Sequence, residues 1–329
     1  MNQPTWNPAE LLKLSGGYWS ACALHAGVKL DLFSQSGTIP ELAEATACDP
    51  RGLEMLLNAL TALGLLTRDG ERYAPTAFAA DYLARSSPRY LGYIIMHHHH
   101  LMAGWSRLDE SVRSGAPLRG RVSHDADDSE RESFEMGMFN LAMQIAPRIV
   151  AKVDLRDRRR LLDLGGGPGS YAIQFCQANP QLSATVYDLA STRPFAEKTI
   201  AAFGLSNRIT FVAGDFTSDD VPNGFDVAWL SHILHGEGPE GCAVILQRAV
   251  AALQPGGMLL VQEFILDDQM DGPLFPALFS LNMLLGTPQG RAYAQGQLEA
   301  MMRAAGAASI RRLEIDLPNG AGVLVGIVG

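Results

Sequence analysis

Three aspartates and one glycine-rich turn are the residues of this 329-residue sequence best suited to hold a small molecule. Asp163 lies in an apolar run that leads directly into the turn 165–169, and Asp188 and Asp215 each end a later apolar run. Glycines let the backbone approach a ligand closely and turn tightly into a helix. A carboxylate at a strand end can accept from both hydroxyls of a ribose, and a second one can accept from an adenine amine. These residues therefore predict a nucleoside-binding site.

The order of residues in the turn narrows the kind of nucleotide fold. It reads Asp-x-Gly-x-Gly-x-Gly with Pro168 before the last glycine, whereas the dinucleotide fingerprint is Gly-x-Gly-x-x-Gly. No Gly-Lys-Ser/Thr follows, which excludes a phosphate-cradling P-loop. Each aspartate alone would be an ordinary loop cap, but three in order, each after its own strand, favour a cofactor site.

The elements that must position these residues are strands alternating with helices. This alternation predicts an α/β fold with a parallel sheet. Two further runs near the C-terminus, 309–316 and 321–328, are expected to close the sheet as an antiparallel pair. The five runs expected to form parallel strands are 161–164, 184–187, 209–212, 225–230 and 258–264.

The N-terminal third carries helix-start signals followed by a short hairpin. Thr38 and Glu41 match a capping box, and Asp49-Pro50 opens another helix. The turn 68–70 separates two short strands. Helices followed by a hairpin indicate a mostly α winged-helix domain. One face of the second helix is marked by Leu53, Leu56, Leu57, Leu60 and Leu63.

A winged helix can read DNA or serve as a scaffold. Residues 1–100 contain seven Lys or Arg against nine Asp or Glu. A DNA-binding domain is basic along its recognition face. The acidic balance therefore favours dimerisation and closure of a substrate pocket.

Composition sets the remaining bounds. The chain is 47% hydrophobic and long enough for two domains, and its net charge of −9 repels nucleic acid on average. The four cysteines are too far apart for a zinc site and read as small buried residues of a reducing compartment. We see no signal peptide and no apolar run of the ~18 residues that span a bilayer. The expected location is therefore the cytoplasm, with no membrane or nucleic-acid partner.

A run of four histidines, 97–100, lies within a helical pattern. Metal ligands on a helix need i, i+3 or i, i+4 spacing, which only the outer two supply, so a surface or pocket-wall role is favoured over a metal site. A Met and Phe stripe, 134–145, follows on another helix. Such a stripe is usually core, but part of it is expected to line an apolar substrate pocket.

The motifs above resemble a known family. The run 162–169, Asp188 and Gly214-Asp215-Phe216 look like class I S-adenosylmethionine methyltransferases. The segment 231–235 (Ser-His-Ile-Leu-His), with Cys242, Leu246 and the run 253–257 (Leu-Gln-Pro-Gly-Gly), is similar to the small-molecule O-methyltransferases. That family includes caffeate and hydroxyindole O-methyltransferases and bacterial polyketide-tailoring enzymes. The resemblance covers nearly the whole chain.

The resemblance implies a fold, a cofactor and an assembly. The fold class is α/β: a Rossmann-like class I methyltransferase sheet, parallel with an antiparallel terminal hairpin, behind the winged helix. The implied domains are 1–105 for dimerisation and 106–329 for cofactor binding, with linking helices over 106–158. The implied cofactor is S-adenosyl-L-methionine, released as S-adenosyl-L-homocysteine, with no metal. The partners are a small-molecule acceptor and a second copy of the chain in a homodimer.

The family's catalytic base falls on His235, and Glu263 matches the carboxylate that orients it. A phenol has a pKa of ~10 and an imidazole ~6.5, so a neutral imidazole can take the proton as the oxygen attacks. Three positions depart from the family pattern. Gly236 replaces an Asp after the base, Gly290 replaces a second orienting acid, and Ser231 replaces a Lys that approaches the cofactor.

The predicted site has two further groups of residues. The cofactor group is Asp163, Gly165, Gly167, Asp188, Leu189, Gly214, Asp215, Phe216 and Ser231. The acceptor-pocket group is Phe139, Met143, His232, Phe279, Asn282 and Met283.

Three functions stay open from the sequence. The first is methyl transfer to a hydroxyl of a small aromatic or polyketide-like molecule. The second keeps the cofactor but transfers the methyl group to sulfur, nitrogen or carbon, since a weakened base suits a thiol, a thioether or an acidic phenol. Relatives that bind the cofactor for a non-methylating reaction are a minority version of it. The third is a winged-helix regulator that senses a ligand, which the acidic charge disfavours.

Overall fold

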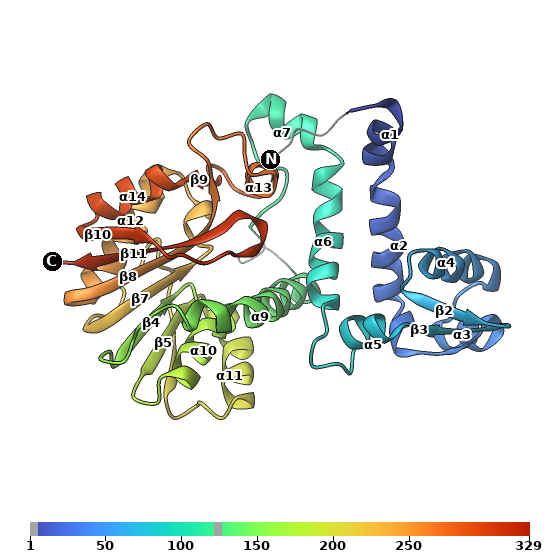
Figure 1. Cartoon of the computed structure of the whole chain (residues 1–329), viewed down its shortest axis with the longest axis horizontal. Helices are drawn as coiled ribbons and strands as arrows, with labels where there is room; N and C mark the ends of the chain where they lie inside the picture. The colour runs from blue at the N-terminus through green and yellow to red at the C-terminus, as the bar shows by residue number, and fades with distance from the viewer. Residues whose placement is uncertain (1–5, 122–126) are drawn as a thin grey trace. The chain divides into compact units, whose positions relative to one another are not determined.

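The computed structural model describes residues 6–121 and 127–329 and contains two compact units (Figure 1). The first is Met1–Leu101 and the second is Met102–Gly329. The helix α6 (Gly92–Trp105) carries the chain from one unit into the other. Each unit is described by itself below.

The first unit consists of helices and a small three-stranded sheet with the order β1-β3-β2. As the capping box predicts, the Glu41 carboxylate accepts from the Thr38 amide at 2.7 Å. Asp49 likewise accepts from the Gly52 amide at 3.0 Å. The elements are α1 (Pro8–Gly16), α2 (Tyr18–Lys29), β1 (Gly37–Thr38), α3 (Ile39–Thr46), α4 (Pro50–Ala62), β2 (Leu66–Asp69), β3 (Arg72–Pro75) and α5 (Ala77–Leu83).

The leucine face predicted for the second helix is largely correct. Leu53, Leu57 and Leu60 are buried in the core of this unit, and Leu56 packs partly against it. Leu63 is 43% exposed. It is the C-cap residue of α4, one position beyond the last residue of the helix.

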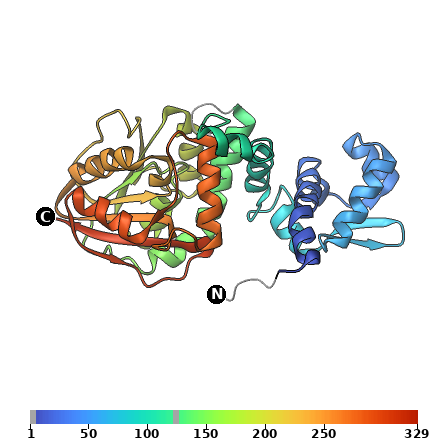
Figure 2. The same cartoon turned by 90° about the horizontal axis from the view of Figure 1, so that it is seen from above.

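The second unit is a seven-strand path flanked by helices, with the order β10-β11-β8-β7-β4-β5-β6 (Figures 1 and 2). Its helices are α7 (Leu108–Ser114), α9 (Asp128–Val150), α10 (Ser170–Ala178), α11 (Arg193–Ala202), α12 (Pro239–Ala252), α13 (Leu274–Gly286) and α14 (Gln295–Ala304). Its strands are β4 (Arg160–Leu164), β5 (Ser183–Asp188), β6 (Ile209–Ala213), β7 (Phe225–Ser231), β8 (Leu253–Leu266), β10 (Ala307–Arg312) and β11 (Ala321–Val328). The short strand β9 (Tyr293–Ala294) pairs with β8.

The pairing confirms the predicted fold class. Strands β4 to β8 pair in parallel, and β11 runs antiparallel to both β8 and β10. The first strand of the terminal pair was expected over 309–316, but β10 starts at Ala307 and ends at Arg312. A register shift between Ala308 and Arg311, with Ser309 at a φ of 49°, interrupts the pairing of β10 with β11 before it resumes at Arg311 and Arg312.

Both faces of this sheet are buried, as expected for parallel strands covered by helices. Leu161 and Trp229 point to one face, where they pack with α9, α10 and α11. Leu162 and Leu230, one residue along the same strands, point to the other face and pack with α12 and α14. This double burial explains why the strands read as continuous apolar runs.

The expectation that all four cysteines are buried is wrong for two of them. Cys176 and Cys242 are fully buried in the second unit. Cys22 is exposed on α2, and Cys48 is half-buried after α3, where it packs against the core of the first unit. Among the described residues, no helix combines the length and the apolar character needed to cross a bilayer.

Candidate active site

The carboxyl ends of β4 and β5 bring the glycine-rich turn and two of the predicted aspartates together. The Gly167 amide donates to Asp188 Oδ2 at 2.7 Å, so the turn after β4 is tied to the end of β5. The Leu189 amide donates to the other oxygen of Asp188 at 2.7 Å. Asp163 is buried below the turn, where its Oδ2 accepts from the Ala172 amide at 3.0 Å. This edge is the predicted cofactor cradle.

Two positions show why the turn requires glycine. Gly165 has a φ of 66°, and a Cβ there would lie 2.2 Å from Ile233 Cδ1 and 3.1 Å from the Phe216 ring. A Cβ on Gly166 would lie 2.6 Å from the Asp163 carboxyl carbon. No side chain therefore covers the backbone of the turn at the place where a ligand must come close. Phe216, the predicted neighbour of adenine, lies beside it. The arrangement fits an adenosyl cofactor.

Asp215 has a local role in the structure. Its Oδ1 accepts from the amide and the hydroxyl of Thr217 at 2.8 and 2.6 Å, so it caps the turn after β6. Gly214 before it lies against Tyr187, whose hydroxyl a Cβ would overlap. A carboxylate can accept several hydrogen bonds. The predicted contact of Asp215 with adenine therefore stays a prediction.

The sequence analysis missed Glu135 on α9. This side chain is 4% exposed and lies beside the cradle, with Oε2 3.5 Å from the position of a Cβ on Gly167. Thr192 Oγ1 donates to Glu135 Oε1 at 3.3 Å and lies 3.4 Å from Asp188 Oδ1. Burial first, and then the charge of Asp188, raise the pKa of Glu135 to about 8. An acid inside the Met and Phe stripe was the signal that could have found it.

A buried amide next to Ser231 was also missed. Ser231 Oγ donates to Gln262 Oε1 at 3.2 Å across the ends of β7 and β8. Gln262 is fully buried. It lies between Val261 and Glu263 at the end of a strand, so its polarity in an apolar run was a signal of a functional edge.

His235 and Glu263 form the centre of the second half of the site. His235 Nδ1 lies 2.8 Å from Glu263 Oε2. The other carboxylate oxygen, Oε1, accepts from the amides of Leu234 and His235 at 2.8 and 3.2 Å. Glu263 is 2% exposed and His235 13%. The predicted base and its predicted orienting acid therefore lie together at the ends of β7 and β8.

The surroundings of Glu263 keep it ionised. Burial alone would raise its pKa, but the charges and hydrogen bonds of His235 and His232 more than offset that effect and hold the pKa far below its ordinary value. An ionised Glu263 accepts Nδ1–H of His235, which leaves Nε2 as the ring nitrogen able to take a proton.

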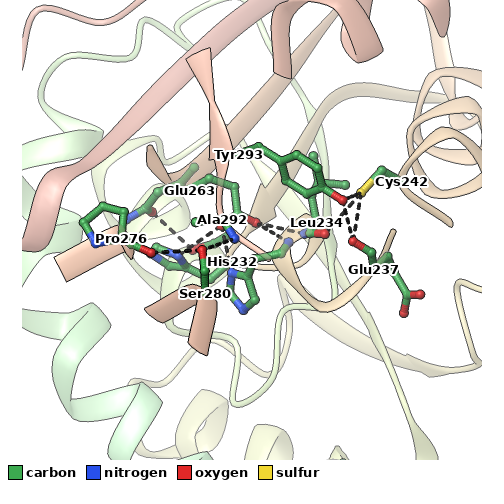
Figure 3. A network of polar contacts seen from close by, with 12 residues as sticks. His232, Leu234, Glu237, Cys242, Glu263, Pro276, Ser280, Ala292 and Tyr293 are labelled. Carbon is green, nitrogen blue, oxygen red and sulfur yellow. Dashed lines mark hydrogen bonds and ion pairs between the residues drawn. The ribbon is translucent and has the colours of Figure 1, made fainter. Parts of the chain in front are cut away.

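A network of hydrogen bonds holds the turn that carries His235 (Figure 3). Leu234 O accepts from Cys242 Sγ at 3.1 Å, and Glu237 O accepts from Tyr293 Oη at 2.6 Å. His235 O accepts from the Arg291 amide at 2.8 Å. Gly236 O accepts from Arg121 Nη2 at 2.9 Å. Each carbonyl of 234–237 thus accepts a hydrogen bond from a residue distant in the sequence or from α12, and these bonds fix the turn that presents the base.

The two glycines that depart from the family pattern differ in their surroundings. A Cβ on Gly290 would lie 2.4 Å from Thr287 Oγ1 and 2.5 Å from the His235 carbonyl oxygen. A Cβ on Gly236 would meet nothing within 4 Å. The backbone at 290 therefore packs closely against the turn that carries the base, whereas position 236 is open.

Aromatic rings surround the base. The Phe279 ring meets the His235 ring edge-on, with centroids 4.7 Å apart. His232 lies over Phe264 with centroids 4.2 Å apart, and its Nδ1 is 3.6 Å from Glu263 Oε2. Because His232, His235 and Glu263 offer ligand atoms within 4.8 Å of one another, the expected absence of a metal stays a prediction.

The rest of the predicted pocket divides in two. Asn282 and Met283 lie on α13 one turn from Phe279, as predicted. Phe139 contacts Phe203 and packs against the core between α9, α10 and α11, and Met143 Sδ accepts from Gln174 on α10 at 3.6 Å. Within the described residues no ring contact or hydrogen bond joins Phe139 or Met143 to His235. Their place in the acceptor pocket therefore stays a prediction.

Comparisons with known proteins match both units. Residues 107–308 match a family model described as an O-methyltransferase domain, and residues 12–85 match one described as an O-methyltransferase dimerisation domain.

Two similar curated relatives come from Streptomyces. The chain is 37% identical to the 3-hydroxy-5-methyl-1-naphthoate 3-O-methyltransferase of Streptomyces sahachiroi, over 97% of this chain and 95% of the relative. It is 32% identical to the tetracenomycin polyketide synthesis 8-O-methyl transferase TcmO of Streptomyces glaucescens, over 95% of each chain. A solved structure described as PigF with SAH is 27% identical with a TM-score of 0.88, over 98% of this chain and all of the other.

Proposed function

The chain belongs to the O-methyltransferase family, and from this premise we propose that it methylates a hydroxyl of a small aromatic, polyketide-like acceptor with His235 as the base. Dependence on S-adenosylmethionine comes with the family. The acceptor class is supported by the naphthoate and tetracenomycin enzymes that this chain resembles. It is also supported by the aromatic rings around His235.

The single observation that carries the proposed mechanism is the contact of His235 with an ionised, buried Glu263. When bound, S-adenosylmethionine supplies the methyl group and the leaving group. The protein must hold the acceptor in line and remove its proton. With Nδ1–H held by Glu263, Nε2 of His235 accepts that proton as the oxygen attacks. The bonded turn 234–237 keeps the imidazole in position during the step.

We propose Asp163, Gly165, Gly167 and Asp188 as the cofactor cradle, with Glu135 added to it. Ser231, Phe216, Gly214, Asp215 and Leu189 complete the proposed cofactor group. This cofactor site is supported by the backbone of the turn, which no side chain covers, and by the contacts that link Asp188 to it. Phe279, His232, Asn282 and Met283 are the proposed acceptor neighbours.

We also propose that the chain works as a homodimer through residues 1–105, with 106–329 as the catalytic domain. The match of residues 12–85 to a dimerisation domain supports this assembly. The cytoplasmic location stays a prediction from the sequence.

The test is methyl transfer from labelled cofactor to acceptors that share one skeleton. We would compare 1-naphthol, 1-naphthalenethiol and 1-naphthylamine with 3-hydroxy-1-naphthoate, and locate the label in each product. Label on the phenolic oxygen is the expected result. Label only on sulfur, nitrogen or carbon would move the function to another acceptor class, and label retained in the cofactor throughout would contradict methyl transfer to all of these acceptors.

A further inference from the structure

Arg119 is a half-buried cation that the proposed chemistry does not use. Its Nη2 lies 3.4 Å from Asn282 Oδ1 on α13. A Cβ on Gly286 would lie 2.7 Å from Arg119 Cζ, so the guanidinium lies against the surface that this glycine leaves open. The Arg119 amide also donates to Leu285 O at 3.3 Å. The side chain is therefore held along α13.

The face of α13 that holds Arg119 also reaches the base. Residues three, four and seven apart lie on one side of a helix, so Phe279, Asn282 and Gly286 share a face. Phe279 contacts the His235 ring at 4.7 Å. With a rise of 1.5 Å per residue, Asn282 and Gly286 lie about 4.5 and 10 Å along the axis from Phe279. One or two fused aromatic rings bridge such a distance.

A second path connects Arg119 to the base. Two residues further along the chain, Arg121 donates to Gly236 O at 2.9 Å, directly after His235. The segment 119–121 therefore runs from the end of α13 to the turn that presents the base.

The two arginines differ in their partners. Arg121 forms an ion pair with Glu237 at 2.5 Å. Within residues 6–121 and 127–329, no carboxylate lies within ion-pair distance of Arg119, and its hydrogen-bond partner there is the neutral Asn282. Burial lowers the pKa of Arg119, and the charge of Glu130 offsets this only in part. Because a guanidinium stays protonated in proteins, a partly buried one favours an anion beside it.

We propose that Arg119, assisted by Asn282, is an anion subsite and that the acceptor is an aromatic hydroxy acid. Its carboxylate lies on Arg119 while its hydroxyl lies at His235. The planar fork of a guanidinium matches a carboxylate with two parallel hydrogen bonds, and the Asn282 amide group can supply a further donor. This inference rests on the proposed function, since it names the acceptor of that site.

The subsite can be tested without turnover. Full-length protein saturated with S-adenosylhomocysteine would be titrated calorimetrically with 1-naphthoate and with 1-naphthamide, neither of which carries a hydroxyl. The wild type should bind the carboxylate about 10- to 100-fold more tightly than the amide, as a charged hydrogen-bonded pair gives. Arg119→Met should lose this preference and keep its affinity for the amide. Arg113→Met, which removes an exposed cation on α7, is the matched control and should keep the preference.

A second variant tests the subsite independently of whether Arg119→Met folds. Asn282→Asp keeps the shape of the side chain and places a carboxylate beside the Arg119 guanidinium, which neutralises the subsite from within. It too should remove the preference for 1-naphthoate. A wild type without preference, or variants of Arg119 and Asn282 that keep it, would overturn the subsite.

Turnover separates the subsite from the proposed function. With 3-hydroxy-1-naphthoate and its amide, Arg119→Met should raise KM for the carboxylate with little change in kcat. If neither compound is methylated while 1-naphthoate still binds through Arg119, the subsite stands and the proposed function fails. If both are methylated equally well with or without Arg119, the function stands and the subsite fails.

Discussion

The site has two halves: the cradle half around Asp188 and the base half around His235. Both bury carboxylates, but the pKa shifts of these carboxylates have opposite directions. Glu263 is 2% exposed, yet the charges and hydrogen bonds of two imidazoles hold its pKa far below the ordinary value. At the cradle, Glu135 is 4% exposed and has one hydroxyl donor, and burial with the charge of Asp188 raises its pKa to about 8. Burial also raises the pKa of Asp163 to about 7. The partners of a buried acid, rather than its burial, decide its charge.

From this difference in pKa we infer that the two halves have separate tasks. The base half is charged and held by a fixed frame, which suits a group that must keep one imidazole in one orientation. The cradle half collects acids near a bare backbone, which suits the binding of a cationic nucleoside. Substitutions in the base half should therefore change turnover, and those in the cradle should change cofactor affinity or its pH dependence.

The largest effect is expected for His235→Ala. Loss of the general base should lower kcat by about a hundredfold or more while the affinity for S-adenosylhomocysteine stays nearly the same. Steady-state kinetics with 3-hydroxy-1-naphthoate and calorimetry measure the two quantities. His232→Ala, which removes the other imidazole near Glu263, should cost less. Unchanged turnover in His235→Ala would remove the base role.

Asp188→Asn tests the cradle half in the same way. This change keeps the shape but removes the charge that accepts hydrogen bonds at the turn, so cofactor Kd should rise about 10- to 100-fold. The value of kcat at saturating cofactor should change little. A fall in kcat with unchanged Kd would show that the two halves do not have separate tasks.

Gly290→Ala tests the close packing of position 290 against the turn that carries His235. The new Cβ would lie 2.5 Å from the His235 carbonyl oxygen, so the free energy of unfolding should fall by about 1–3 kcal/mol and kcat should fall with it. Thermal unfolding and steady-state kinetics measure both.

Gly236→Ala is the matched control, since its Cβ meets nothing within 4 Å. It should leave the free energy of unfolding unchanged or raise it by about 0.4–1 kcal/mol, because Ala at an unstrained position lowers the conformational entropy of the unfolded chain. Equal losses in the two variants would contradict close packing at 290.

A further expected effect is a pH dependence of stability. The folded pKa of Glu135, about 8, lies above its unfolded value of 4.5, so the folded state binds the extra proton and stability falls as pH rises from about 5 to 8. Glu135→Gln has no such proton. Between pH 6 and 7 the wild type should lose about 1.4 kcal/mol more than the variant.

Urea unfolding of cofactor-free protein at the two pH values measures this difference. Asp163 contributes a loss of the same sign in both proteins, so it cancels in the comparison. Parallel pH profiles would show that Glu135 is ionised in the folded state.

Local patterns in the sequence predicted the elements and the residues proposed for the cradle. Strands, caps and the turn 165–169 depend on neighbouring residues, because apolar runs, capping side chains and left-handed glycines act over a few positions. Asp188 could be placed beside this turn because parallel strands end at one edge of a sheet. The family motif supplied His235 and Glu263.

The partners of each charged group depend on the tertiary structure. Glu135 comes to the cradle from a helix that precedes the sheet, and Arg119 comes to α13 across more than 160 positions of the chain. The structure also packs Phe139 against the core of the second unit, and it shows the backbone of Gly290 against the His235 carbonyl. Each outcome depends on which faces of distant elements meet, and no local pattern of residues encodes that choice.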